Sequence, residues 1–485
     1  MEAATSASLS YCLMFIKRIS MFMLLPQRAF SIPPIERTDS RPRKRVWKNP
    51  VFFIFFLTLT IFLAHLYIIN SPPSADCTHT SSTSPNIKLP GCVMDEVYYV
   101  PAAISIVQGQ KCTLSIGSNC NPEHPFLSKA LIALGIYLFG NDTFGWRFFM
   151  VVIGSLSIPI FFVLLRRITS NRRFIYFATL LFASDTLFFV HSSIAVIDAP
   201  SVFFGLLSFL LYFSKFRIWK INNILFSGLF AGLSILSKET GAFFVLTLAI
   251  YHILRKDYGS IARRLYDIFL IILVSSLTFL SLQQLYDFFY FQSSPSVFDH
   301  IGYMLSYSTS LTGGEWNGSI FNGPIYPIDW FLFFKPIGYF VTRVTVNPGN
   351  LSYISTGYFG IPNMIVVWLL YGWFPILAAK ILGKLEEKSE TWRSDMEAAK
   401  FSAIWILSQY IPYLVLWLSL GRTTYPFYMI QFIPALCIGA AYFISREWFP
   451  SKIAYVYISA AFGWFFFYYP VKDFLPTWLR IILSR

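Results

Sequence analysis

The feature that most constrains this chain is a series of apolar runs, each about as long as a bilayer is thick. A helix needs about 20 apolar residues to cross the hydrocarbon core, and we identify about eleven candidates. Charged residues are only 13% of the 485 positions, against about 25% in soluble domains. The sequence therefore predicts an all-α polytopic membrane protein, with crossings at 51–69, 146–165, 174–190, 199–214, 222–237, 241–254, 265–285, 361–382, 401–420, 427–445 and 453–469.

The distribution of basic residues predicts the orientation. The formal net charge of +14 could by itself suggest a nucleic-acid partner. If the N-terminus is cytoplasmic, however, 27 of the 38 Lys and Arg residues fall on inner segments, the asymmetry typical of membrane proteins. The basic balance therefore reflects topology, and we find no nucleic-acid signature.

Residues 221–254 could form one long helix or two short ones. A single pass would place Arg255, Arg263 and Arg264 on the outer side, whereas two short passes keep them inside. We therefore predict two passes, with the turn "SKETG" at or near the outer face.

The rest of the chain divides simply. Residues 1–50 are Arg-rich, and basic residues interrupt their apolar run, unlike a signal peptide. We interpret them as a cytoplasmic N-terminal extension or the product of a misassigned start codon. Residues 51–485 are predicted to be one membrane domain without repeats, with structured outer loops at about 70–145 and 290–360.

Cysteines cluster in the first outer loop, where an oxidising compartment would allow one or two disulfides. Four cysteines permit three full pairings, and the sequence does not choose among them. Unpaired thiols in a reducing compartment are the alternative. The residues are Cys77, Cys92, Cys112 and Cys120.

Ionisable residues gather where the predicted crossings meet the outer face. Asp95 and Glu96 follow the first crossing, and Arg147 lies about one turn inside the second, where an Arg is costly unless paired. The run after His124 is too short to span, so we predict an interfacial helix. A mixed site of carboxylates and cations is predicted from Asp95, Glu96, His124, Lys129, Arg147, Asp198, Lys238, Glu239, Arg422 and Tyr425.

Such a site suits a substrate with an anionic head and an apolar tail, such as a polyprenyl phosphate carrying a sugar. Arg and Lys bind phosphate, and a phosphate leaves with little need for a proton. One carboxylate, acting as general base on the acceptor, is then sufficient. A single in-line displacement would invert the anomeric centre. No metal is required, although a carboxylate-bound divalent ion would be compatible.

Several segments resemble the protein O-mannosyltransferases of the GT-C superfamily, in their small prokaryotic form. The similar segments run in family order over about residues 90–440. Phe126 and Ser128 replace the Pro and Gly of the family's His-Pro-Pro-Leu-Gly-Lys motif. The segments are "MDEVYYVPAA", "NPEHPFLSKALIALGIYLFGNDTFGWRFF", "IAVIDAPSVFF", "GLSILSKETG", "GPIYPIDWFLFFKPIGY" and "RTTYPFYMIQFIPA".

The resemblance implies a GT-C bundle of about 11 transmembrane helices that moves mannose from dolichyl or polyprenyl phosphate to Ser/Thr hydroxyls of exported proteins. It implies Asp95 as the base, Glu96 as a residue that shapes the site, and Arg147, Lys129 and His124 as phosphate ligands. The lack of the eukaryotic β-trefoil insert favours a prokaryotic cell membrane over the endoplasmic reticulum, with the N-terminus cytoplasmic and the site outside.

Each assignment has a competing interpretation. Asp198 could be a helix cap, Lys238 and Glu239 could pair only with each other, and Arg422 and Tyr425 could be interfacial anchors. Another GT-C transferase, using a different lipid-linked sugar or a lipid or glycan acceptor, would share these motifs. A transporter would place ionisable residues near the midplane and often show repeats, neither of which we see.

Overall fold

The computed structural model of the chain describes residues 49–73, 92–115, 118–214, 223–255, 259–312, 326–332, 336–346, 351–383 and 390–483. Residues 1–48 of the proposed N-terminal extension, and Cys77, lie outside these residues.

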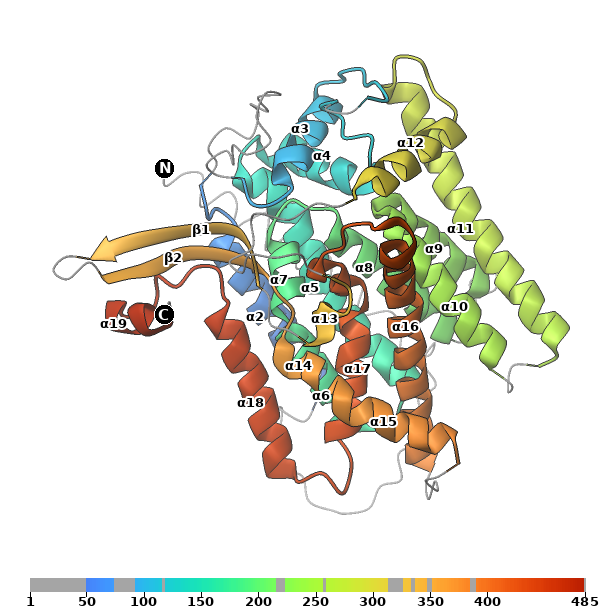
Figure 1. Ribbon diagram of the computed structural model, residues 1–485, viewed down its shortest axis with the longest axis vertical. Coiled ribbons are helices and arrows are strands. Elements are labelled where there is room, and N and C mark those ends of the chain that lie inside the picture. The colour runs from blue at the N-terminus through green and yellow to red at the C-terminus, as the bar shows by residue number, and fades with distance from the viewer. Residues whose placement is uncertain are drawn as a thin grey trace. The chain divides into compact units, whose positions relative to one another are not determined.

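Helices make up most of the described structure (Figure 1). They are α2 (Pro50–Ile68), α3 (Glu96–Val107), α4 (Leu127–Phe139), α5 (Thr143–Ile168), α6 (Arg172–Ala183), α7 (Thr186–Ser193), α8 (Asp198–Phe213), α9 (Asn223–Ser237), η3 (Glu239–Gly241), α10 (Ala242–Leu254), α11 (Ile261–Tyr290), α12 (Val297–Ser310), α13 (Asp329–Leu332), α14 (Met364–Trp368), α15 (Leu370–Ile381), α16 (Glu390–Leu420), η4 (Pro426–Phe432), α17 (Ile433–Ile444), α18 (Ser451–Phe467) and α19 (Thr477–Leu483).

Each predicted crossing coincides with a helix or a consecutive pair of helices, which makes this an integral membrane protein. Among the described residues, six spans are long and apolar enough to cross a bilayer, and the bent pair α6–α7 is a seventh. The other four, α8, α9, α10 and α18, have only 13 to 17 residues. Length and composition therefore support six or seven crossings, and the number eleven stays a prediction.

The region 221–254 forms two helices, as predicted. α9 ends at Ser237, and η3 separates it from α10. Gly241 lies so close to the last turns of α9 that an added Cβ would be 2.3 Å from the Ser234 carbonyl carbon. Because only glycine tolerates this approach, the sequence "SKETG" can make the turn that carries Lys238 and Glu239.

Small residues let the helices around the site pack closely. α8 packs on α5 and α9, and α9 packs on α11. At the α9–α11 contact, Cβ atoms added at Gly228 and Gly232 would lie 2.9 Å from Val274 and 2.6 Å from Thr278. This packing places the α8 N-terminus beside the turn that follows α9.

The bend between α6 and α7 is 52°. Asp185 caps α7 by accepting a hydrogen bond from the Phe188 N–H at 2.8 Å, an arrangement that starts a new helix rather than continuing the old one. Its other carboxylate oxygen accepts from the Asn363 N–H at 2.9 Å. The break therefore redirects α7 and ties its first turn to the segment after the β-hairpin.

A β-hairpin in the second long loop departs from the all-α expectation. β1 (Ile337–Val346) pairs antiparallel with β2 (Leu351–Gly360), from Ile337 opposite Gly360 to Val346 opposite Leu351. The β-branched and aromatic residues of "YFVTRVTV" favour a strand. Figure 1 shows the hairpin projecting sideways from the helices, with its base near α7.

Candidate functional site

Glu96 and Arg147 form a fully buried ion pair that joins α3 to α5. Arg147 Nε and Nη2 donate to the two Glu96 carboxylate oxygens at 2.7 and 2.8 Å. Nη1 donates to the carbonyls of Ile69 and Ser71. Glu96 also accepts the Ala195 N–H at 2.8 Å. The pair thus connects four segments, and neither side chain is exposed.

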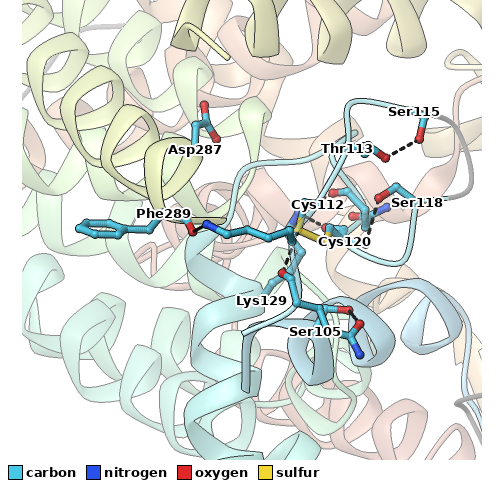
Figure 2. The surroundings of a disulfide bond; sticks show 12 residues. Ser105, Cys112, Thr113, Ser115, Ser118, Cys120, Lys129, Asp287 and Phe289 are labelled. Carbon is cyan, nitrogen blue, oxygen red and sulfur yellow. Dashed lines mark hydrogen bonds between the residues drawn. A yellow bond between two sulfur atoms is a disulfide. The ribbon is translucent and has the colours of Figure 1, made fainter. Parts of the chain in front are cut away.

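Lys129 is also fully occupied. Its ammonium donates to the carbonyls of Cys120, Asn121 and His124, and only 1% of the residue is exposed. A disulfide joins Cys112 to Cys120 (Figure 2). The disulfide and Lys129 therefore hold the loop that precedes α4, with His124 at its end.

The disulfide decides part of the cysteine question that the sequence left open. Cys92 is disulfide-bonded as well. Cys112 also joins the loop to α11, since its N–H donates to the Tyr290 carbonyl at 2.7 Å. The first long loop is therefore structured where it is described, as predicted.

These contacts do not fit the direct phosphate binding that the resemblance implied for Arg147 and Lys129. An ammonium has three N–H donors, and three carbonyls already accept from Lys129. Arg147 is enclosed by Glu96 and by carbonyls that follow α2. Both cations form the framework of the site rather than its surface.

His124 and Glu239 come together from segments 115 residues apart. His124 Nδ1 lies 2.9 Å from Glu239 Oε2, and the two side chains are 20% and 34% exposed. Lys238 and Glu239 therefore do not pair only with each other, because Lys238 turns to a different carboxylate.

That carboxylate is Asp198. Lys238 Nζ donates to Asp198 Oδ1 at 2.6 Å, and His191 Nδ1 lies 3.2 Å from Asp198 Oδ2. Asp198 is the first residue of α8, yet the start of that helix has no side-chain cap. The capping alternative for Asp198 is therefore wrong, and its carboxylate belongs to the site.

Asp95 is the one site carboxylate without a hydrogen bond or ion pair to any described residue. It is half-buried and precedes α3, where its side chain forms no cap. Met94, just before it, has φ of +55°, in the left-handed region that non-glycine residues rarely adopt. Such backbone strain is common at functional sites.

The surroundings of Asp95 raise its pKa. Burial is the largest cause, and the negative charge of Asp198 adds to it. The nearby Lys238, His124 and His191 oppose this rise. A carboxylate whose proton affinity is raised accepts a proton more readily, as a general base must.

A second cation, Arg422, lies in the segment before η4 and approaches the same ring, Tyr428, as Lys238 does. Lys238 Nζ and Arg422 Cζ lie 5.3 and 5.9 Å from the centroid of the Tyr428 ring. Arg422 Nε donates to the Ser308 carbonyl at 2.6 Å, which ties it to α12. The Tyr425 ring stacks on Phe427 beside them.

The site therefore contains Asp95, His124, Asp198, Lys238, Glu239 and Arg422, at the end of the bundle where α3, α4 and α12 lie (Figure 1). Sequence reasoning missed His191, Tyr339 and Tyr428. His191 is a polar residue inside the apolar segment "TLFFVHSSIAV", which was the available signal. Tyr339 offered none, because only the hairpin brings it to His191. Within the described residues, no three His, Cys, Asp or Glu side chains are placed to hold a metal ion.

Residues 123–282 match the family model described as dolichyl-phosphate-mannose-protein mannosyltransferase. A polyprenol-phosphate-mannose–protein mannosyltransferase of Corynebacterium glutamicum is 29% identical over 204 residues, 34% of this chain and 38% of that protein. Its namesake in Mycolicibacterium smegmatis is 32% identical over 122 residues, 24% of this chain and 22% of that protein. The matched regions thus cover well under half of these relatives.

Among solved structures, the yeast (Saccharomyces cerevisiae) Pmt1–Pmt2 protein O-mannosyltransferase complex bound to the sugar donor aligns over 90% of both chains, with a TM-score of 0.55 and 11% identity. That likeness concerns the fold, and the expected GT-C architecture is confirmed. Residues 123–282 are therefore similar to the dolichyl-phosphate-mannose-protein mannosyltransferase family.

Proposed function

We propose that this protein is a mannosyltransferase that moves mannose from a polyprenyl phosphate to Ser or Thr hydroxyls of exported proteins, with Asp95 as the general base. The observation that carries the proposal is the Asp95 carboxylate. It has no hydrogen-bonding partner among the described residues, yet it lies within the electrostatic reach of Lys238 and His124. The names of the relatives support the donor and the protein acceptor.

The reaction needs a base on one side of the sugar and fixed cations on the other. Asp95 accepts the proton of the acceptor hydroxyl while that oxygen attacks the anomeric carbon. The bond between this carbon and the phosphate oxygen breaks, and the electron pair leaves with the phosphate. Attack opposite the leaving group inverts the anomeric centre, which predicts an α-linked product from a β-linked donor.

The donor phosphate is assigned to Lys238 and Arg422, with His124 as a third contact. Lys238 and Arg422 are 5% and 7% exposed, so water screens their charge little. A guanidinium has five N–H donors, more than its bonds to Ser308 and Tyr428 use. Fixed cations of this kind stabilise the charge that develops on a leaving group. Glu96, Arg147 and Lys129 then support the site from beneath.

The test is transfer by purified protein supplied with polyprenyl phosphate mannose and a Ser/Thr-rich peptide. Asp95→Asn keeps the shape and removes the base, so the turnover rate should fall by about 100-fold or more while donor binding persists. Glu397→Gln is the matched control, because within the described part of the chain the Glu397 side chain forms one ion pair, an exposed one with Lys400. Full activity in Asp95→Asn would remove Asp95 from this role. A folded wild type that binds donor yet modifies no peptide would point to another acceptor.

The proposed location is a prokaryotic cell membrane with the site on the outer face. The charge asymmetry supports this orientation. Gln108 and Ser451 are both exposed and lie on segments predicted to face opposite sides. In a Cys12→Ser background, an impermeant thiol reagent should label Gln108→Cys in intact cells and Ser451→Cys only after permeabilisation. The reverse pattern would invert the topology.

A further inference from the structure

Four buried side chains form a continuous chain of polar contacts from the β-hairpin to the site. Tyr339 Oη lies 2.8 Å from His191 Nε2. His191 Nδ1 lies 3.2 Å from Asp198 Oδ2, and Lys238 Nζ donates to Asp198 Oδ1 at 2.6 Å. The four residues are at most 5% exposed. They come from β1, α7, α8 and the turn after α9, so only the tertiary fold connects them.

The chemistry of these four side chains determines the direction of each hydrogen bond. A carboxylate only accepts, so His191 must donate to Asp198 through Nδ1–H. In a neutral imidazole the other nitrogen, Nε2, is then an acceptor, and the Tyr339 hydroxyl donates a hydrogen bond to it. Tyr339 therefore selects the imidazole tautomer that binds Asp198. Without the hydroxyl, the other tautomer becomes available, and it offers Asp198 no donor.

The hairpin base and α7 are joined at two further points. Thr186 Oγ1 donates to the Ile361 carbonyl at 2.6 Å, and the Asn363 N–H donates to Asp185 at 2.9 Å. Gly360, at the end of β2, makes room for the tyrosine, since an added Cβ would lie 2.1 Å from Tyr339 Oη. The hairpin base and the start of α7 are therefore tied together as one unit, and that unit carries both Tyr339 and His191.

Asp198 is the point at which this unit meets the site. Each of its oxygens has one partner, Lys238 or His191, so the imidazole sets the orientation of the carboxylate that holds the Lys238 ammonium. Lys238 in turn lies 5.3 and 5.9 Å from the ring centroids of Tyr428 and Phe427. The Tyr339 ring packs against Phe427 as well, at 6.3 Å between centroids.

We infer that Tyr339 and His191 are positioning residues, which orient Asp198 and thereby hold Lys238 where the departing phosphate needs a cation. The inference rests on the proposed transferase function. It makes the β1–β2 hairpin part of the alignment of the reaction centre, because Tyr339 on β1 acts through His191 and Asp198.

The first test is Tyr339→Phe, which removes one hydroxyl and keeps the ring. Because the negative charge on the phosphate grows as the bond breaks, kcat should fall about tenfold or more while the donor KM changes little. Tyr353→Phe is the matched control, since Tyr353 lies on β2 of the same hairpin and its hydroxyl meets Arg480, not His191. Its kcat should stay within about twofold of wild type.

A double-mutant cycle separates positioning from loss of structure. If Tyr339 acts only through Asp198, Tyr339→Phe should have almost no further effect in an Asp198→Asn background. His191→Gln, which can both donate and accept, should retain several-fold more activity than His191→Leu. Melting temperatures of all variants, measured beside the kinetics, identify any that are misfolded.

The outcomes separate the inference from the function beneath it. Wild type without transferase activity would overturn the proposed function itself. Active wild type with an equally active Tyr339→Phe would overturn the inference alone. Additive losses in the cycle, or equal activity of His191→Gln and His191→Leu, would also overturn it, because Tyr339 and His191 would then act by another route.

Discussion

Arg147 binds both carboxylate oxygens of Glu96, at 2.7 and 2.8 Å, with neither side chain exposed. The geometry is bidentate, the strongest arrangement for this pair of side chains. The pair lies directly behind Asp95, because Glu96 is the next residue in the chain. The pair fixes the start of α3, and with it the position of Asp95, the proposed base.

Removing one partner of this pair should destabilise the protein strongly. Arg147→Met leaves the Glu96 carboxylate buried and unpaired, which costs about 3–5 kcal/mol. Combining it with Glu96→Gln should recover part of that loss. Lys400→Met breaks a pair with Glu397 in which both side chains are at least 40% exposed and should cost at most about 1 kcal/mol. Thermal unfolding of the purified protein checks this, and an unchanged melting temperature for Arg147→Met would contradict it.

Arg422→Gln should weaken use of the donor specifically. Loss of the guanidinium that we assign to the donor phosphate should raise the donor KM or lower kcat, with a combined loss of about tenfold or more in kcat/KM for donor. The peptide KM should stay near its wild-type value. Lys400→Gln, at an exposed pair with Glu397, is the control. An effect on the peptide KM alone would assign Arg422 to acceptor binding instead.

The pH dependence should report the raised pKa of Asp95. The base is active when ionised, so the transfer rate should fall as the pH drops through this pKa. That limb should lie above the ordinary aspartate value of about 3.9. Asp198→Asn removes the negative charge that adds to the rise and should move the limb to lower pH. A limb that stays in place would show that another group titrates. The charged and titratable side chains that interact electrostatically with Asp95 are Asp198, Lys238, His124, His191, Tyr98, Tyr99, Tyr307, Tyr339 and Tyr425.

The disulfide should matter for activity through the loop that it closes. In the Cys112→Ser, Cys120→Ser double variant, the disulfide no longer closes the loop, while Lys129 can still donate to the carbonyls at positions 120, 121 and 124. We expect a lower melting temperature, since a disulfide commonly stabilises by about 2–4 kcal/mol, and a several-fold loss of transfer. Cys437→Ala, which changes the buried free cysteine, should not alter the sensitivity of the activity to reducing agent. An active, thermally unchanged double variant would contradict the prediction.

The pairing of the β-hairpin and the bend between α6 and α7 could not be predicted from the sequence. Apolar length predicted a span at 174–190, but the break depends on Asp185 reaching the Asn363 N–H, 178 residues later in the chain. Likewise the residue types of "YFVTRVTV" favour a strand, but they do not show that this strand pairs with β2. Long-range hydrogen bonds of this kind leave no local pattern in the sequence.

The roles of the cations also needed the structure. From the sequence alone, phosphate binding is equally compatible with each of four cations, Lys129, Arg147, Lys238 and Arg422. Lys129 and Arg147 are buried among carbonyls and Glu96. Lys238 and Arg422 both lie near the Tyr428 ring at the site. The groups that each cation contacts, and not its residue type, distinguish the structural cations from those proposed to bind the donor.

The sequence by itself determined that this is a helical membrane protein, roughly where its helices lie, and that carboxylates and cations meet at one end of it. Those conclusions depend on apolar length and charge, which are local properties of the chain. Only the tertiary structure decided which charges neutralise each other, that Asp95 is left unpaired among the described residues, and that Tyr339 reaches His191. The reason is that an ion pair or a hydrogen bond depends on distance in space, and packing brings together residues that lie far apart in the sequence, by 148 positions for Tyr339 and His191 and by 178 for Asp185 and Asn363.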